Sequence, residues 1–358
     1  MPGNRSAAPW VLVTDDVNGQ NRSAVSAVRA LAQGGYRPAV STCGRLSVAA
    51  ASRYCARRVS LPPASSPTYP TALRHEVDTG GYLAVLPASD VALVALRAPG
   101  AELVDKEILG RRAAEAGIAT LPGRVFSSVS QLRDAADELD YPVVVKAVLK
   151  SGQGDFQARR LDSARAVRAL DAPGTLYVQP HVADQLRAVC GVVWKGRFLA
   201  LSHQRYVRLW PRQAGVGSAA VTVAPDETLE EPLARLLANH DGVFQAQFVG
   251  RYLLDINPRV FGSMPLSVAA GANLPAIACD ARRGIERPLL RTRPGVRYRW
   301  VEGDTKGIVQ AVRDKAMPVG AAVREMLPHR GTAHSLESLT DPGPALVRLA
   351  HLAGRARP

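Results

Sequence analysis

The sequence predicts an α/β fold at its N-terminus, followed by an α+β fold. Three observations predict this class. The first hundred or so residues alternate short β-branched runs with helical patterns, which indicates a parallel sheet covered by helices. Further along, pairs of strand patterns are separated only by short turns, as in antiparallel hairpins. The length of 358 residues is enough for two or three domains, each with its own core.

The N-terminal part contains the parallel unit. The expected strands are 11–14, 38–41, 59–61 and 83–86, and the expected helices are 23–31, 47–56 and 72–80. No G-x-G-x-x-G sequence follows the first strand, where a dinucleotide-binding unit would carry it. The sequence therefore argues against a nicotinamide-dependent reductase.

Helices and antiparallel strands share the remainder of the chain. The expected helices are 103–116, 130–139, 229–238, 305–316 and 344–353, and the expected strands are 141–146, 176–179, 188–194, 197–202, 243–248 and 252–257. We therefore expect three parts: an N-terminal α/β domain at 1–102, a middle domain at 103–290, and a C-terminal helical extension at 291–358.

The charge is strongly positive, with 45 Lys and Arg against 31 Asp and Glu, a net charge of +14 and a pI near 10.1. The arginines are scattered and aromatic residues make up only 5%, so no basic run with interleaved aromatics predicts nucleic-acid binding. An enzyme that handles polyanionic substrates, or compositional drift, explains the charge equally well.

Other broad classes are also disfavoured. No apolar stretch reaches the roughly 18 residues of a membrane span, and no secretory leader pattern is visible. The four cysteines include no C-x-x-C pair, so neither a zinc site nor a disulfide framework has local support. We expect a cytoplasmic protein without membrane attachment.

The most informative segment is the hairpin at 243–257. Asp255 and Asn257 are two residues apart on one strand and share a face. A three-residue turn at 250–252 would place Gln247 opposite Asp255 and Gln245 opposite Asn257, whereas a two-residue turn would put the pairs on opposite faces. We expect the three-residue turn. Amide oxygens with one carboxylate suit Mg²⁺, and the alternative is an amphipathic hairpin with its polar face in solvent.

Several motifs occur in an order typical of one superfamily. Asp-Ile-Asn-Pro-Arg at 255–259 is followed by Phe-Gly-Ser at 261–263, Tyr-Pro-Val-Val-Val-Lys lies at 141–146, and Asp-Lys at 105–106 opens a helix. Together they resemble the ATP-grasp superfamily, in its carbamoyl-phosphate-synthase-like branch. The resemblance implies a Rossmann-like pre-ATP-grasp domain, then a two-subdomain ATP-grasp fold with a helical C-terminal extension.

The resemblance also implies roles for individual residues. Lys106 and Lys146 would contact ATP phosphates, which agrees with the cost of placing a cation at the end of an apolar strand without an anion. The phosphate loop would use Ser151, Gly152 and Gly154, and the strand beside adenine and ribose would use Gln179, His181, Val182 and Asp184. Mg²⁺ or Mn²⁺ would be held by Gln247, Asp255 and Asn257, with Arg208 and Arg259 as catalytic cations near the acceptor.

The implied function is an ATP-dependent ligase. It would activate a small-molecule carboxylate as an acyl phosphate for attack by an amine or thiol, releasing ADP and phosphate. The alternative is a catalytically degenerate ATP-grasp partner protein, because Asp255 replaces the usual Glu and Gln247 stands where many members have Glu. Nucleic-acid binding is the third hypothesis. Oligomeric state is left open, a homo-oligomer included.

Overall fold

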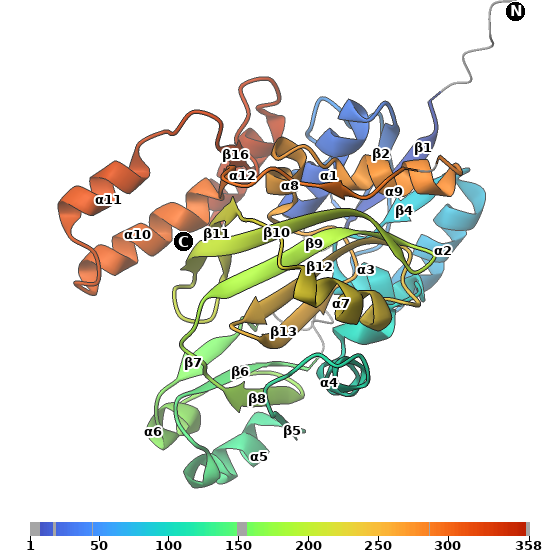
Figure 1. The fold of residues 1–358 in the computed structure, drawn as a ribbon. Helices are drawn as coiled ribbons and strands as arrows, with labels where there is room; N and C mark the ends of the chain where they lie inside the picture. The colour runs from blue at the N-terminus through green and yellow to red at the C-terminus, as the bar shows by residue number, and fades with distance from the viewer. Residues whose placement is uncertain (1–7, 17–18, 45, 149–155, 286, 356–358) are drawn as a thin grey trace, which may run out of the picture.

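Three β-sheets organise the chain (Figure 1). The computed structural model describes residues 8–16, 19–44, 46–148, 156–285 and 287–355. Ser151, Gly152 and Gly154 of the expected phosphate loop lie outside these ranges. No helix among the described residues is both long and apolar enough to span a bilayer.

The N-terminal sheet is parallel, as the alternating patterns predict. Its strands run in the order β3-β2-β1-β4. The elements are β1 (Trp10–Asp15), α1 (Arg22–Gln33), β2 (Arg37–Thr42), β3 (Arg57–Ser60), α2 (Tyr69–Thr79), β4 (Ala84–Leu86) and α3 (Asp90–Ala95). The buried side chains of β1 pack on both sides, against α1 and against α2.

One expected helix of this region is absent, because turns occupy 48–54 instead. Ser47 donates its hydroxyl to Asp15 Oδ2 at 2.6 Å and accepts the backbone N–H of Ala50 at 3.0 Å. A serine side chain that bonds the backbone locally competes with helix formation. The prediction of a helix at 47–56 is therefore wrong.

A small antiparallel sheet with the order β5-β8-β6-β7 follows in the chain. Its region contains η1 (Ala101–Val104), α4 (Lys106–Glu115), β5 (Arg124–Phe126), α5 (Val129–Asp134), η2 (Ala136–Glu138), β6 (Val143–Ala147), β7 (Arg159–Leu161), α6 (Ala164–Arg168) and β8 (Leu176–Pro180). This sheet has its own core, in which Leu132, Val145 and Leu176 are fully buried.

The third and largest sheet, here the central sheet, has the order β13-β12-β9-β10-β11-β15-β16. Its region contains β9 (Leu186–Trp194), β10 (Arg197–Trp210), β11 (Val216–Thr222), η3 (Glu227–Leu229), α7 (Glu230–Leu236), β12 (Gly242–Val249), β13 (Tyr252–Asn257), α8 (Met264–Ala269), α9 (Leu274–Arg282) and β14 (Leu290–Arg291), which pairs with β10. Its β13 edge faces the small sheet, with α4 beside it (Figure 1).

The C-terminal extension is not only helical. It contains β15 (Arg297–Arg299), α10 (Val301–Arg313), α11 (Val319–Met326), β16 (Ala333–His334) and α12 (Gly343–Arg355). The two short strands continue the central sheet past β11, and they are too short to leave a clear pattern in the sequence. Asp341, which precedes α12, connects the C-terminal extension with the N-terminal region by accepting hydrogen bonds from Arg29 and Ser52.

Candidate functional site

The hairpin β12–β13 has the predicted side-chain pairing but not the predicted turn. Gln245 lies opposite Asn257 and Gln247 lies opposite Asp255. The turn itself has two residues, because Val249 pairs with Tyr252, and a β-bulge between Gln247 and Phe248 then restores the register. An extra residue on one strand changes which side chains share a face of the sheet, as a longer turn would. The three-residue turn was therefore wrong, while the pairing it was meant to explain is confirmed.

Lys106 and Asp255 form an ion pair at the edge of this hairpin. Asp105 caps α4 by accepting from the backbone N–H groups of Glu107 and Ile108, so the next residue begins the helix. This geometry directs Lys106 inward, where its side chain is 5% exposed, and Asp255 is 13% exposed. A buried cation requires an anion nearby, and Asp255 supplies it.

Lys146 reaches the same place from the small sheet. Its Nζ donates to the backbone oxygen of Leu254 at 3.0 Å and lies 5.3 Å from the centre of the Tyr177 ring. The two predicted phosphate-binding lysines thus come from separate elements, α4 and β6, and meet at neighbouring residues of β13. The structure brings together Lys106, Lys146 and Asp255.

Beyond Asp255 the face of the central sheet is polar but uncharged. We call the side chains of Gln204, Tyr206, Gln245, Gln247 and Ser263 the amide network. Both Gln245 and Gln247 donate to the Tyr206 hydroxyl, at 3.2 and 2.9 Å. Ser263 donates to Gln204 at 2.8 Å and accepts from Gln245 at 3.2 Å. Burial raises the pKa of the Tyr206 phenol, so this network carries no charge at neutral pH.

Arg259 closes the other end of the hairpin. Its Nη2 donates to Asn257 Oδ1 at 2.9 Å, its Nη1 donates to the Val260 oxygen at 3.0 Å, and its Nε donates to Asp90. Asn257 also donates from Nδ2 to Gln245 at 3.3 Å, which fixes both ends of its amide. Arg259 therefore lies next to the predicted metal ligands, whereas Asp90 belongs to the N-terminal domain.

The predicted adenine strand lies on β8 and just after it. Gln179 is 7% exposed and pairs with Val144 of β6, and the His181 backbone N–H donates to Pro142 at 2.9 Å. Burial, and secondarily Arg160, lowers the pKa of His181, so its ring is neutral at physiological pH. Val182 is half-buried, while Asp184 is exposed and lies beside Gly250 in the hairpin turn. Their roles toward a nucleotide stay predictions.

Arg208 does not join this cluster. Its Nε and Nη2 contact the two carboxylate oxygens of Asp304 at 2.6 and 3.0 Å, and its Nη1 contacts Glu325 at 2.6 Å. Both partners belong to the C-terminal extension. All three guanidinium nitrogens are therefore engaged in holding α10 and α11, and a catalytic role for Arg208 stays a prediction.

Sequence reasoning missed Asp90, Tyr206 and Gln204. A signal for two of them exists, because Gln204 and Tyr206 are two residues apart on β10 and so share one face of a largely buried strand. Asp90 left no such signal. Its role depends on Arg259, which lies 169 positions further along the chain.

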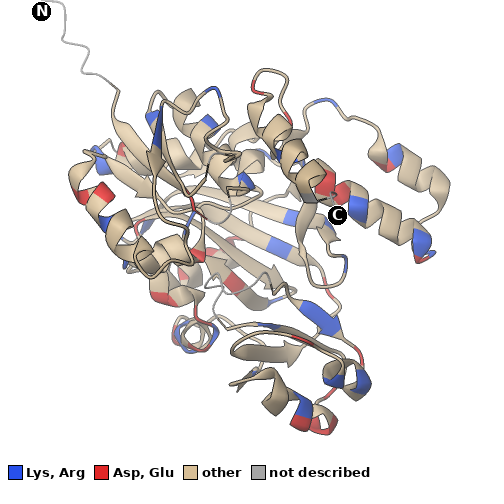
Figure 2. Cartoon of the chain, turned by 180° about the vertical axis from the view of Figure 1, so that it is seen from behind, with Lys and Arg blue, Asp and Glu red and all other residues tan. Residues whose placement is uncertain are grey.

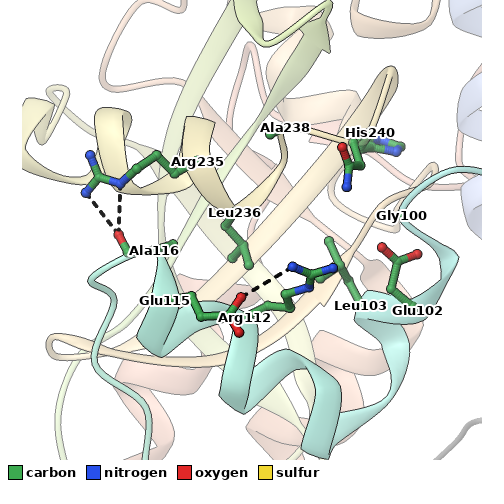
Figure 3. Close-up of a pocket in the computed structure, with 11 residues that line it drawn as sticks. Gly100, Glu102, Leu103, Arg112, Glu115, Ala116, Arg235, Leu236, Ala238 and His240 are labelled. Carbon is green, nitrogen blue, oxygen red and sulfur yellow. Dashed lines mark hydrogen bonds and ion pairs between the residues drawn. The ribbon is translucent and has the colours of Figure 1, made fainter.

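A cavity of about 170 Å³ lies between α4 and the segment from α7 to β12 (Figure 3). Figure 3 shows Arg112 paired with Glu115, and Arg235 donating to the backbone oxygen of Ala116. The cavity shares none of the residues predicted to bind nucleotide or metal. The polar face of the hairpin, rather than this cavity, is therefore the candidate site.

The donor set at the hairpin fits a hard cation. Asp255 offers a carboxylate, and Gln247 and Asn257 offer amide oxygens on the same face. Mg²⁺ takes oxygen ligands and keeps several positions for water and substrate phosphates, so few protein ligands are enough. Among the described residues no group of three or more His, Cys, Asp or Glu could hold a metal.

Comparisons with known proteins agree on the fold. Residues 201–304 match the family described as ATP-grasp in the biosynthetic pathway with Ter operon. No curated protein matches the sequence. An Aspergillus clavatus carboxyaminoimidazole ribonucleotide synthase complexed with ATP is 17% identical, with a TM-score of 0.62 over 80% of each chain.

Two further solved structures are similar. The biotin carboxylase domain of Hydrogenobacter thermophilus 2-oxoglutarate carboxylase, in complex with MgADP, ADP and bicarbonate, is 15% identical with a TM-score of 0.59, over 82% of this chain and 74% of that one. The L-amino acid ligase of Bacillus licheniformis is 15% identical with a TM-score of 0.56, over 78% and 75%. At these identities the likeness establishes a shared fold.

Proposed function

Because the chain has the ATP-grasp fold, we propose that it is an ATP-dependent ligase that joins a carboxylate to an amine or thiol, with release of ADP and phosphate. One observation carries the proposal: two lysines from separate elements reach neighbouring residues of β13, Lys106 at the carboxylate of Asp255 and Lys146 at the backbone oxygen of Leu254. The similar structures include one with ATP, one with MgADP and a ligase for amino acids, which supports this reaction class.

Separate residues of the chain would bind the phosphates, the metal ion and the acceptor. Lys106 and Lys146 would neutralise the phosphates, and Gln247, Asp255 and Asn257 would hold Mg²⁺ or Mn²⁺, which when bound adds charge neutralisation at the transferred phosphoryl group. Arg259 would face the acceptor carboxylate from the end of β13. Lys106, which is paired with Asp255, would exchange this partner for the phosphates of bound ATP, and the carboxylate would then be available to hold the metal ion.

The first test is a thermal-shift titration with ATP, with and without Mg²⁺. A ligand at 100 times its Kd stabilises a fold by about 2.7 kcal/mol, which is readily measured. We expect a Mg²⁺-dependent rise in Tm for the wild type and none for Asp255→Ala. The matched control is Asp162→Ala, which removes an aspartate from an exposed pair with Arg160 and should leave the rise intact. The absence of any shift in the wild type would contradict the nucleotide site.

A second candidate function rests on Gln247. With an amide in place of a second carboxylate, the site has one negative charge, and the protein would then bind ATP as a partner protein without turning it over. ADP release during incubation with a panel of carboxylates and amines separates the two functions. Release that depends on both substrates and is lost in Lys146→Ala supports the ligase, whereas ATP binding without any release favours the partner protein.

The charge distribution gives no support to a nucleic-acid interface. Figure 2 shows Lys and Arg dispersed over helices and strands of the described chain, interspersed with Asp and Glu. Many of the arginines form ion pairs, such as Arg187 with Asp226 and Arg291 with Glu230. Nucleic-acid affinity that falls steeply with salt concentration would be required to revive that hypothesis.

A further inference from the structure

An acidic residue of the N-terminal domain contacts the candidate metal site through an arginine. Asp90 is the first residue of α3, and it is 8% exposed. Its Oδ1 accepts from Nε of Arg259, whose side chain is 13% exposed. Ser89 already caps the helix by accepting from Ala92, so the end of α3 does not by itself explain a buried aspartate.

Arg259 is held in one orientation by three contacts on three nitrogens. Asp90 takes Nε, the Val260 oxygen takes Nη1, and Asn257 Oδ1 takes Nη2. All three hydrogen bonds have a charged donor, but only the one to Asp90 also has a charged acceptor, which makes it an ion pair. Asp90 is therefore the group that chiefly determines where the guanidinium lies.

The guanidinium in turn determines which way the Asn257 amide faces. Oδ1 accepts from Arg259 while Nδ2 donates to Gln245, so the oxygen and the nitrogen have different partners and the flipped amide would lose both contacts. Only the amide oxygen can ligate a cation. A flipped amide would present its NH₂ group, which cannot ligate a metal ion.

The backbone holds the two domains together at this place. The N–H of Val260 donates to the Pro87 oxygen at 3.2 Å, and Asn21 donates from Nδ2 to the Ala88 oxygen at 2.5 Å. The segment before α3 is thus bound both to the end of β13 and to the start of α1. Asp90 acts from a fixed position relative to the hairpin.

We infer that Asp90 is a positioning residue for the metal site: it orients Arg259, which fixes the Asn257 oxygen toward a divalent cation. This inference rests on the proposed nucleotide and metal function. It connects α3, beside the N-terminal sheet, with the strand that carries the predicted metal ligands.

The test measures Mn²⁺ binding by electron paramagnetic resonance in the presence of ATP, on the full chain. Partners that orient metal ligands typically contribute 10- to 100-fold in metal affinity. We expect Asp90→Asn to weaken Mn²⁺ binding by about tenfold or more, while affinity for ATP without metal stays unchanged because the lysines are untouched. Asp90→Glu keeps the charge and should restore part of the loss.

Asp280→Asn is the matched control. Asp280, on α9, is also 8% exposed and also connects the two domains, by accepting from Tyr36 and Arg287, but these partners lie outside the hairpin. Equal losses of Mn²⁺ affinity in the Asp90 and Asp280 variants would mean that general loosening of the interface is responsible, and would overturn the inference.

A double variant distinguishes an effect of Asp90 through Asn257 from a general loss of stability. If Asp90 acts through Asn257, then Asp90→Asn should have little further effect on Mn²⁺ affinity in the Asn257→Ala background, whereas independent effects would add. Additive losses, or wild-type affinity in a folded Asp90→Asn variant, would overturn the inference. Failure of the wild type to bind Mn²⁺ with ATP would instead contradict the proposed function.

Discussion

The two ends of the central sheet both carry buried ion pairs, but of different kinds. At the β13 end one ammonium, of Lys106, meets one carboxylate, of Asp255, and their side chains are 5% and 13% exposed. Toward the β15 end the Asp304 side chain is fully buried and is shared between the guanidinium groups of Arg208 and Arg299. The Ser218 hydroxyl donates to the same carboxylate at 3.3 Å.

The difference indicates which carboxylate can change its partner. A lysine is a point charge on a flexible stem, and a metal ion or a phosphate can take its place beside the carboxylate or draw it away. Arginine holds a carboxylate through a planar fork, and here two arginines share one aspartate that water does not reach. The β13 end is therefore suited to ligand exchange, and the β15 end anchors the C-terminal extension.

The largest effect on stability is expected at the anchor. Asp304→Asn leaves Arg208 and Arg299 without their shared charge, and breaking a buried pair costs about 3–5 kcal/mol. Glu325→Gln is the control, because Glu325 contacts the same Arg208 but is 45% exposed, so it should cost about 1 kcal/mol or less. Urea unfolding measures both. Equal losses would show that burial does not distinguish the two partners.

At the β13 end we expect a substitution that strengthens metal binding. Gln247→Glu adds a second carboxylate opposite Asp255, and we expect it to raise Mn²⁺ affinity by roughly three- to tenfold, because ligand charge tunes the affinity of such sites. Gln310→Glu adds the same charge at an exposed position of α10 and is the control. An unchanged Mn²⁺ affinity in Gln247→Glu would place the metal elsewhere.

The same comparison shows what the sequence could predict. Lys146, Asp255 and Asn257 lie in local motifs, and alternation along β13 is enough to put the last two on one face. The pairing with Gln247 depended on a bulge, which no pattern in the hairpin revealed. The resemblance predicts Arg208 near the acceptor, and the sequence around it gives no sign of its ion pair with Asp304, 96 positions away. Long-range ion pairs are decided by tertiary packing, so Asp90 and Asp304 emerged only from the structure.

The smallest effect concerns a buried acid held by hydrogen bonds. Asp15 accepts from Ser47 and from the backbone N–H of Asn21, and burial raises its pKa to about 7. The folded state therefore keeps a proton that the unfolded chain loses near pH 4, so the free energy of unfolding falls as pH rises from about 4 to 7 and stays lower above it.

Asp15→Asn removes this titration and tests its sign. Each pKa unit is worth 1.36 kcal/mol. On going from pH 5 to pH 8, the free energy of unfolding of the variant should therefore rise by roughly 1–3 kcal/mol relative to that of the wild type. Urea unfolding at both pH values measures this change. Asp314→Asn, at an exposed pair with Arg212, should show no such change. A gain that is the same at both pH values would mean that Asp15 is ionised throughout, and that its hydrogen bonds outweigh its burial. The acid would then resemble Asp304, whose buried carboxylate is paired with two arginines.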